Sequence, residues 1–194
     1  MGSHETPPAV TRAMLEAVFE PGELLTSPDG ILGAVTDADA REVLRTLGLP
    51  VWDNPWFDVD DELGERLERV SEWDLELSEC YDHVPPGAED WIGLALFPYD
   101  SIAFDPESGK VYCFPDDAEI YLLNSSLRSF VHFHYLLKSE QPNYDQVTLR
   151  IPEREVISLR VREAMAEADP AALEAPESCW SDILKSITDP RYRS

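Results

Sequence analysis

The sequence predicts an α+β fold, in which an antiparallel sheet is flanked by helices at the N- and C-terminal ends. The central part of the chain carries the strand signals, above all the continuous apolar run 91–97 and two short apolar segments joined by a turn over 106–109. The parts before and after it place apolar residues at three- and four-residue steps, which is helical spacing. Strands and helices are thus segregated along the chain, which favours an antiparallel sheet.

Two helices are expected before the sheet. Thr11 is the N-cap candidate of the first, whose apolar residues lie at helical spacing and which ends at 21–22, a Pro-Gly pair. Thr36 or Asp37 can cap the second, whose apolar residues precede Gly48, a favourable C-cap residue. The aromatic, proline-broken segment 51–57 that follows is expected to be extended.

Within the segment 60–77 the spacing of apolar residues changes from a helical period to alternation. Over 60–71 the apolar residues share one helical face, and two Glu–Arg pairs at i,i+4 spacing are in the favourable order: Glu62 with Arg66, and Glu65 with Arg69. Over 73–77 apolar and polar residues alternate, which indicates a half-buried strand. We therefore expect a helix followed by a strand.

The remaining elements complete the sheet and the C-terminal helices. A strand over 91–97, a hairpin of 101–105 with 110–114, and a short strand over 120–123 are expected. Asn124-Ser125 is expected to cap a long helix. A charged amphipathic helix then runs from Glu153 to about Ala168, and a last helix carries Leu173 and the apolar residues of 180–187.

Length and composition indicate one cytoplasmic domain. The 194 residues, of which 43% are hydrophobic and 10% aromatic, suit a single folded domain over 11–188 with a flexible tail over 1–10. The three cysteines Cys80, Cys113 and Cys179 are odd in number and widely separated, which argues against a disulfide framework and suits a reducing compartment. No apolar run approaches the length of a membrane span, and the N-terminus lacks the regions of a signal peptide.

The charge of the chain is strongly negative and unevenly distributed. Thirty-nine Asp and Glu face fifteen Lys and Arg, for a net charge of −24, and residues 50–125 alone hold twenty acids and three bases. A field of this sign repels nucleic-acid phosphates and attracts basic surfaces, so we expect a basic protein partner and no direct binding to nucleic acid. The alternative is a solvated acidic shell that keeps the protein soluble, although such a shell should spread its charge evenly.

Motifs for catalysis or metal binding are not found in the sequence. It contains no glycine-rich phosphate loop, nucleophile elbow or H-E-x-x-H motif. The run 58–62 opens like a calcium loop, but Leu63 and Arg69 occupy the positions that require Gly and Glu. Cys80 and His83 lack a second ligand pair, and His132 and His134 would point apart on a helix. We expect a protein that is not an enzyme, with no catalytic residues, metal or cofactor.

Several segments, taken in their order, resemble the SUKH superfamily (Smi/Knr-like proteins), and within it the bacterial group-four immunity proteins. The segments are TRAMLEAVF (11–19), AREVLRTLGLP (40–50), IAFD with GKVY (102–105 and 109–112), NSSLRSF (124–130), and DPAAL with WSDIL (169–173 and 180–184). The likeness covers roughly 11–188, and 73–86 departs from the family pattern. It implies a SUKH-like antiparallel sheet with flanking helices.

The resemblance also implies a function. Members of this family are mostly immunity proteins that neutralise toxins, often nucleases or nucleic-acid deaminases, by direct binding. We therefore expect a basic toxin partner, encoded by a neighbouring gene, that binds through an acidic surface. The alternative is a non-enzymatic SUKH-like adaptor or regulatory scaffold that binds a cellular protein.

The expected partner-binding residues lie in and next to the acidic segment. Glu62 and Glu65 would be partly neutralised by Arg66 and Arg69, which leaves five freer acids in the segment. Aromatic residues among the acids would supply anchors that become buried against the partner. Core packing is the alternative for each aromatic side chain, and it is favoured for Trp73 and Trp91, while Tyr99 is a further surface candidate. The predicted site comprises Trp52, Trp56, Phe57, Asp58, Asp60, Asp61, Glu68, Glu72, Asp116 and Asp117.

Overall fold

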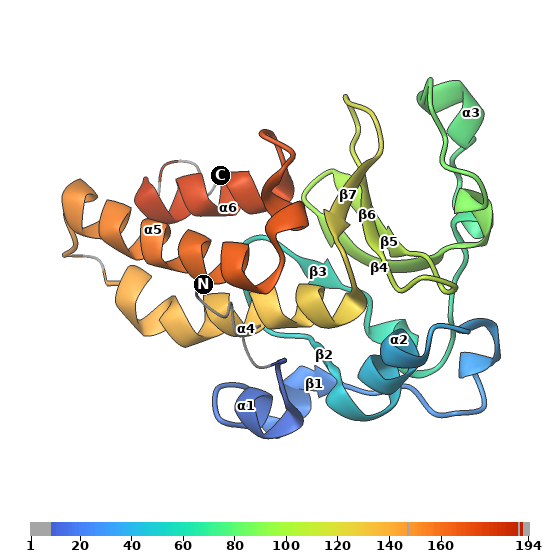
Figure 1. The fold of residues 1–194 in the computed structure, drawn as a ribbon, viewed down its shortest axis with the longest axis horizontal. Helices are drawn as coiled ribbons and strands as arrows, with labels where there is room; N and C mark the ends of the chain where they lie inside the picture. Colours follow the sequence, from blue (N-terminus) through green and yellow to red (C-terminus); the bar gives the residue numbers. More distant parts are fainter. Residues whose placement is uncertain (1–8, 147, 190, 192–194) are drawn as a thin grey trace, which may run out of the picture.

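The C-terminal helices and the main sheet occupy opposite ends of the molecule (Figure 1). The computed structural model describes residues 9–146, 148–189 and 191. Three C-terminal helices pack together at one end: α4 (Leu127–Tyr144), α5 (Ile151–Ala168) and α6 (Cys179–Thr188). The sheet at the other end is antiparallel throughout, so the predicted α+β class is confirmed.

Two short helices and a small sheet form the N-terminal region. The side chain of Thr11 caps α1 (Arg12–Glu16) by accepting a hydrogen bond from the backbone N–H of Met14. Asp37 caps α2 (Ala38–Glu42), which continues as the π-helix η3 (Val43–Leu47). Both predicted helices are present, the first one shorter than its apolar pattern. The other elements here are η1 (Pro21–Glu23), β1 (Leu24–Leu25), η2 (Leu32–Ala34) and β2 (Leu49–Pro50).

Five strands form the main sheet in the order β3-β4-β5-β6-β7, so neighbours in the sheet are also neighbours in the chain. They are β3 (Asp58–Val59), β4 (Ile92–Phe97), β5 (Asp100–Phe104), β6 (Val111–Phe114) and β7 (Tyr121–Asn124). The predicted hairpin is confirmed, with Ser101 opposite Phe114 and Phe104 opposite Val111. No period in the sequence indicates β3, which is defined by its pairing with β4.

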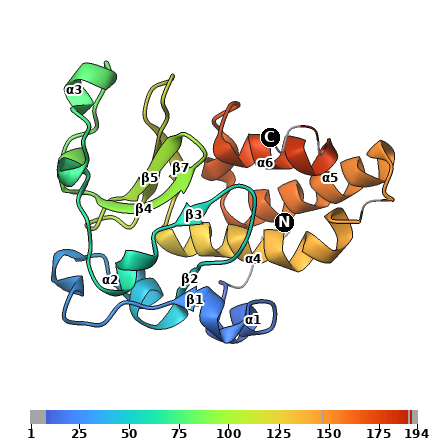
Figure 2. The same cartoon turned by 180° about the vertical axis from the view of Figure 1, so that it is seen from behind.

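The two faces of the sheet pack against different parts of the chain. Side chains of the first face join the main core with α4 and α6: Ile102, Phe104, Val111 and Cys113. Side chains of the second face form a separate cluster with the segment that connects β3 to β4: Ala103 and Phe114, with Val70, Leu77, Tyr81 and Trp91. This connecting segment rises past the sheet to α3 (Figure 2). The second face is therefore covered only in part, by the connecting segment, which is mostly not helical.

The connecting segment is irregular, so the predicted helix over 60–71 and strand over 73–77 are wrong. It forms only short turns: η4 (Asp61–Gly64), η5 (Val70–Glu72), α3 (Leu77–Cys80) and η6 (Ala88–Asp90). Backbone hydrogen bonds tie it to β4 and the residue before it, from Val70 N–H to the Trp91 carbonyl and from Gly93 N–H to the Glu68 carbonyl (both 2.9 Å). Contacts with the sheet outweigh a local pattern whose i,i+4 pairs stabilise a helix by only about 0.2–0.5 kcal/mol each.

The aromatic segment 51–57 forms no helix or strand and bends at residues 55–56, so it is not extended throughout as predicted, and its large side chains are buried. Trp52 Nε1 donates to His134 Nδ1 (3.2 Å), and Trp56 Nε1 donates to Ser186 Oγ (3.0 Å). The Phe57 ring packs against Phe130 and Trp180, with centroids 5.5 and 5.0 Å away. The expectation that Trp52, Trp56 and Phe57 are exposed anchors is therefore wrong. Indole N–H groups can be buried when an acceptor lies within reach, and α4 and α6 supply both acceptors.

Two of the three C-terminal helices, α4 and α6, begin at serine caps. Ser126 caps α4 by accepting from Ser129 N–H (3.1 Å), one or two residues after the predicted cap. The predicted last helix is divided into η7 (Pro170–Leu173) and α6, whose cap is Ser178. At the start of α6, the fully buried Trp180 donates its indole N–H to the Leu123 carbonyl (3.2 Å). Hence α6 is joined directly to β7.

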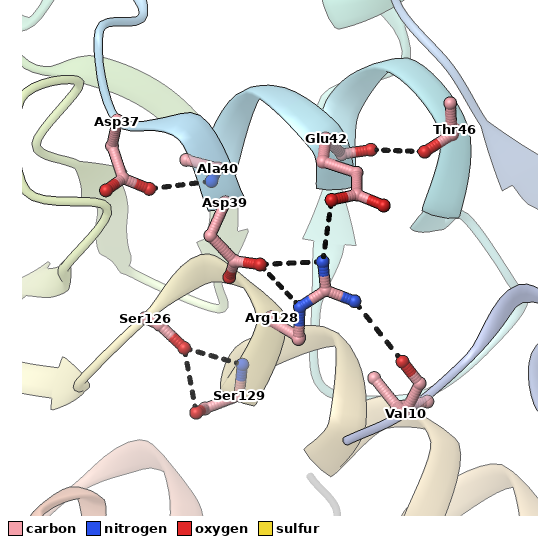
Figure 3. Close-up of polar contacts among 9 residues, drawn as sticks. All are labelled: Val10, Asp37, Asp39, Ala40, Glu42, Thr46, Ser126, Arg128 and Ser129. Atoms are coloured by element: carbon pink, nitrogen blue, oxygen red, sulfur yellow. Dashed lines mark hydrogen bonds and ion pairs between the residues drawn. The ribbon is translucent and has the colours of Figure 1, made fainter.

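Arg128 at the start of α4 joins this helix to the N-terminal region (Figure 3). Its guanidinium group binds Asp39 on α2, with Nε 2.7 Å from Oδ1, and lies 3.8 Å from Glu42. It also donates to the carbonyl of Val10 (3.3 Å). One half-buried cation thus compensates two of the eight acids among residues 1–49.

Gly109→Ala should lower the free energy of unfolding more than Gly87→Ala. Both glycines have positive φ (71° and 79°), where an alanine costs about 1–2 kcal/mol. Only at Gly109 would the new Cβ meet another group, since Asp37 Oδ1 lies 2.8 Å away and is the oxygen that caps α2 (Figure 3). Disturbing a cap costs about 1 kcal/mol, so urea unfolding should show at least that difference. Equal losses would contradict the expected coupling of hairpin and helix.

Stability should fall with pH below about 6.5 because of His134. Complete burial lowers its pKa from 6.5 to about 3, so the unfolded chain binds one more proton than the folded protein between these values. The stabilisation is present in full above pH 6.5, and about 1.4 kcal/mol is lost per pH unit below it. His134→Asn keeps an acceptor for Trp52 and removes the titration. Its unfolding free energy, measured from pH 7.5 to 4.5, should fall less steeply than that of the parent; parallel curves would refute the assignment.

Candidate functional site: an acidic groove on the sheet

A groove with a volume of about 880 Å³ lies on the part of the second face that the connecting segment leaves open. Its floor is a row of cross-strand partners, one from each of four strands: Asp58, Leu96, Ser101 and Phe114. Because directly opposite residues in an antiparallel sheet point to the same side, these four side chains face the groove together. The sheet thus provides a rigid floor.

Acidic side chains surround this floor. Seven line the groove, and no Lys or Arg is among its lining residues in the part of the chain that the structure describes. They come from β3, from η4 and its cap, from the connecting segment and from the loop after β6: Asp58, Asp60, Asp61, Glu62, Glu68, Asp74 and Asp116. Like charges gathered with few counter-charges create a negative potential that attracts cationic groups.

The local structure places these carboxylates at the surface. In β3 the side chains alternate, so that Val59 is buried in the core and Asp58 is exposed. Asp60 caps η4, its Oδ1 accepting from Glu62 N–H (2.9 Å), and its own backbone N–H donates to the Leu94 carbonyl of β4 (3.0 Å). These bonds fix the backbone from which Asp61 and Glu62 extend.

The structure brings together five of the seven acids that the sequence analysis proposed for the site. Asp58, Asp60, Asp61, Glu68 and Asp116 line the groove, whereas Asp117 is exposed outside it. Glu62 and Asp74 also line it and are absent from the predicted set. Identifying them required the path of the connecting segment, because both lie where a helix and a strand were expected.

Glu72 lies outside the groove and is not one of the freer charges. It accepts from the backbone N–H of Arg69 and from the guanidinium of Arg66, each at 2.8 Å, and these contacts lower its pKa, the backbone bond most. Arg66 also lies 3.6 Å from Glu68, and Arg69 pairs with Asp90. The expected neutralisation of Glu62 and Glu65 is therefore wrong, because the helix that would pair them does not form.

Apolar and aromatic side chains accompany the acids, among them Tyr99, Leu96 and Trp73. Tyr99, in the turn between β4 and β5, is 88% exposed, and Leu96 on the floor is 53% exposed. Trp73 is half-buried; its indole lies over Gly93 and meets the Phe114 ring edge to face at 5.5 Å. The groove therefore offers exposed apolar surface within a ring of negative charge.

Comparison with known proteins identifies the family. No helix in the described ranges is long and apolar enough to cross a membrane. Searches among curated proteins and among solved structures found no significant match. A family model described as SUKH-4 immunity protein matches residues 10–186, which is nearly the whole chain. The chain therefore belongs to the SUKH-4 immunity protein family.

Proposed function

We propose that this protein neutralises a toxin of the nuclease or nucleic-acid deaminase type by binding a basic toxin domain in the acidic groove. It acts in the cytoplasm, without catalysis of its own, and its partner is encoded by a neighbouring gene. The observation that carries the proposal is the set of seven groove acids with no base among the described lining residues. The family match supports a toxin as the partner.

Charge complementarity explains why such a groove suits this class of toxin. An enzyme that acts on nucleic acid presents Lys and Arg to the phosphates of its substrate. A rigid surface with carboxylates around an apolar floor competes for the same cationic groups, steers the encounter and rejects partners of the wrong charge. The groove acids Asp58, Asp61, Glu62, Asp74 and Asp116 have no ion pair with the described residues, so they are available to a partner.

The exposed apolar groups supply the contacts that charge alone does not. Binding energy at interfaces is concentrated in a few large side chains that become desolvated, among which Tyr is enriched. Tyr99 and Leu96 are positioned for this role, in place of the buried Trp52, Trp56 and Phe57. We propose Tyr99 as the main anchor.

The function is tested with the toxin domain encoded beside this gene. The purified proteins are mixed, the affinity is measured at about 50 mM and 500 mM salt, and toxin activity is assayed with and without the immunity protein. Screening at high salt should weaken a groove complex strongly. An absence of binding to any neighbouring toxin, or binding indifferent to salt, would contradict the proposal. A locus without a toxin gene would favour the adaptor function instead.

Reversal of three groove acids, Asp58→Lys, Asp61→Lys and Glu62→Lys, should slow association about tenfold or more at low salt, because steering is lost. Folding should be retained, since exposed substitutions change stability by only about 0.5 kcal/mol each. Stopped-flow mixing measures the rate and thermal unfolding checks the fold.

The matched control reverses three exposed acids of α5, Glu155→Lys, Glu163→Lys and Glu167→Lys. Its change in net charge is identical, but it leaves the groove intact, so association should stay close to that of the parent. If both triple variants slow association equally, net charge and not the groove determines the rate. If neither does, the groove is not the interface.

Tyr99→Ala should weaken the complex by about tenfold or more, mainly through faster dissociation, because an apolar anchor contributes more than about 1 kcal/mol. The loss should be similar at low and high salt, unlike that of the charge variant. Leu159→Ala, at a residue of α5 with 56% exposure, is the control and should leave affinity unchanged. Unchanged affinity of Tyr99→Ala would remove this residue from the interface.

A further inference from the structure

Four potential ligand groups from distant parts of the chain meet between the sheet and α6. Cys113 lies on β6, Cys179 is the first residue of α6, Asp100 begins β5 and Tyr121 begins β7. The two sulfur atoms are 3.6 Å apart, and Cys113 Sγ is 3.8 Å from Asp100 Oδ2. Both cysteines are buried, and Asp100 is partly exposed.

The spacing of these atoms fits a tetrahedral metal site. Zinc binds thiolate sulfur at about 2.3 Å and carboxylate oxygen at about 2.0–2.2 Å, so two sulfur ligands of a tetrahedral site are about 3.8 Å apart and sulfur and oxygen about 3.5 Å apart. The ligand atoms of Asp100, Cys113 and Cys179 all lie within 4.8 Å of one another. They can therefore reach one ion with small side-chain rotations.

Neighbouring groups orient the ligands. The backbone N–H of Asp116 donates to Asp100 Oδ1 (3.3 Å), which leaves Oδ2 directed at Cys113. The Tyr121 hydroxyl contacts Cys179 Sγ at 3.2 Å and accepts from the Cys179 backbone N–H at 3.0 Å. Such outer contacts hold the ligands of metal sites in position.

The described part of the chain places no cation against this cluster. Within the described residues, no hydrogen bond or ion pair joins Lys or Arg to any of the four side chains. Contact with Cys179 and burial raise the pKa of the Cys113 thiol, and burial raises the pKa of the Asp100 carboxyl. The groups are thus costly to ionise unless a positive charge enters among them.

We propose that Cys113, Cys179 and Asp100 bind one zinc ion, with water in the fourth position. Binding displaces the two thiol protons to solvent and engages Asp100 as a carboxylate, so that the three ligands and the ion carry a net charge of −1. The ion enters from the side of Asp100, the partly exposed ligand. The site joins β5 and β6 to α6 and adjoins Asp116 of the acidic groove. It is independent of the toxin proposal.

The experiment uses the reduced, metal-free full chain. Cobalt(II), the spectroscopic substitute for zinc, should produce a thiolate-to-metal charge-transfer band and intense visible bands of a tetrahedral site, saturating at one ion per chain. Zinc should then displace cobalt and raise the melting temperature. The absence of a charge-transfer band in the parent, with its cysteines kept reduced throughout, would overturn the proposal.

Variants assign the ligands. Cys113→Ser and Cys179→Ser should each abolish the charge-transfer band, while Cys80→Ser, at the exposed third cysteine, should keep it. Asp100→Asn preserves shape at a partly exposed position and should weaken zinc binding by at least the factor of about 10–100 that loss of an outer-shell partner costs. If the two buried variants, Cys113→Ser and Cys179→Ser, do not fold, the spectra of the parent and of Asp100→Asn still test the site. A band that depends on Cys80, or one untouched by Asp100→Asn, would refute this set of ligands.

Discussion

The packing of Phe57 between α4 and α6 is the interaction on which the rest of the arrangement depends. Its ring lies 5.0–5.5 Å from those of Phe97, Phe130, His134 and Trp180, and so joins the aromatic segment 51–57, the sheet and the C-terminal helices. Asn54 shapes the chain before it, with its side-chain oxygen accepting from the N–H groups of Trp56 and Phe57 and its amide donating to two carbonyls. Asp58 of β3, the first groove acid along the chain, follows immediately. The apolar packing of this core therefore holds the groove carboxylates close together at the surface, although they repel one another.

Several basic residues are bound to partners within the helical end of the molecule, away from the groove. Arg154 is buried and donates to the carbonyls of Tyr144 and Gln146 (2.8 and 2.9 Å), which closes the turn between α4 and α5. Lys138 pairs with Glu23 (3.3 Å) and lies 4.6 Å from the centroid of the Trp52 ring. Cations bound in this way are not available to the groove. The uneven charge of the sequence is thus reproduced in space, with the compensated end helical and the uncompensated end built on the sheet.

The sequence was sufficient for elements whose signal is local and insufficient for those set by distant contacts. The hairpin, β4 and α5 follow from their period and turn residues, and five groove acids were found from charge alone. The segment after β3 also has a helical period, but backbone hydrogen bonds hold it against the sheet instead. As a result Glu72 lies outside the groove and Asp74 lines it. Burial of Trp52 and Trp56 depends on His134 and Ser186, 82 and 130 residues away. The contact between Cys113 and Cys179 likewise cannot be predicted from their spacing in the sequence.

The alternation in β3 has a consequence for how this protein can change over time. Asp58 and Val59 occupy opposite faces of a two-residue strand, and a slip of one position would bury the carboxylate and expose the valine. A single insertion or deletion between Phe57 and Asp60 would thus remove a charge from the groove and place it in the core. Replacement of Asp58 alone alters only the solvent face. Lineages that diversify this groove are therefore free to exchange residues at its surface while the length of the chain leading into it stays constant.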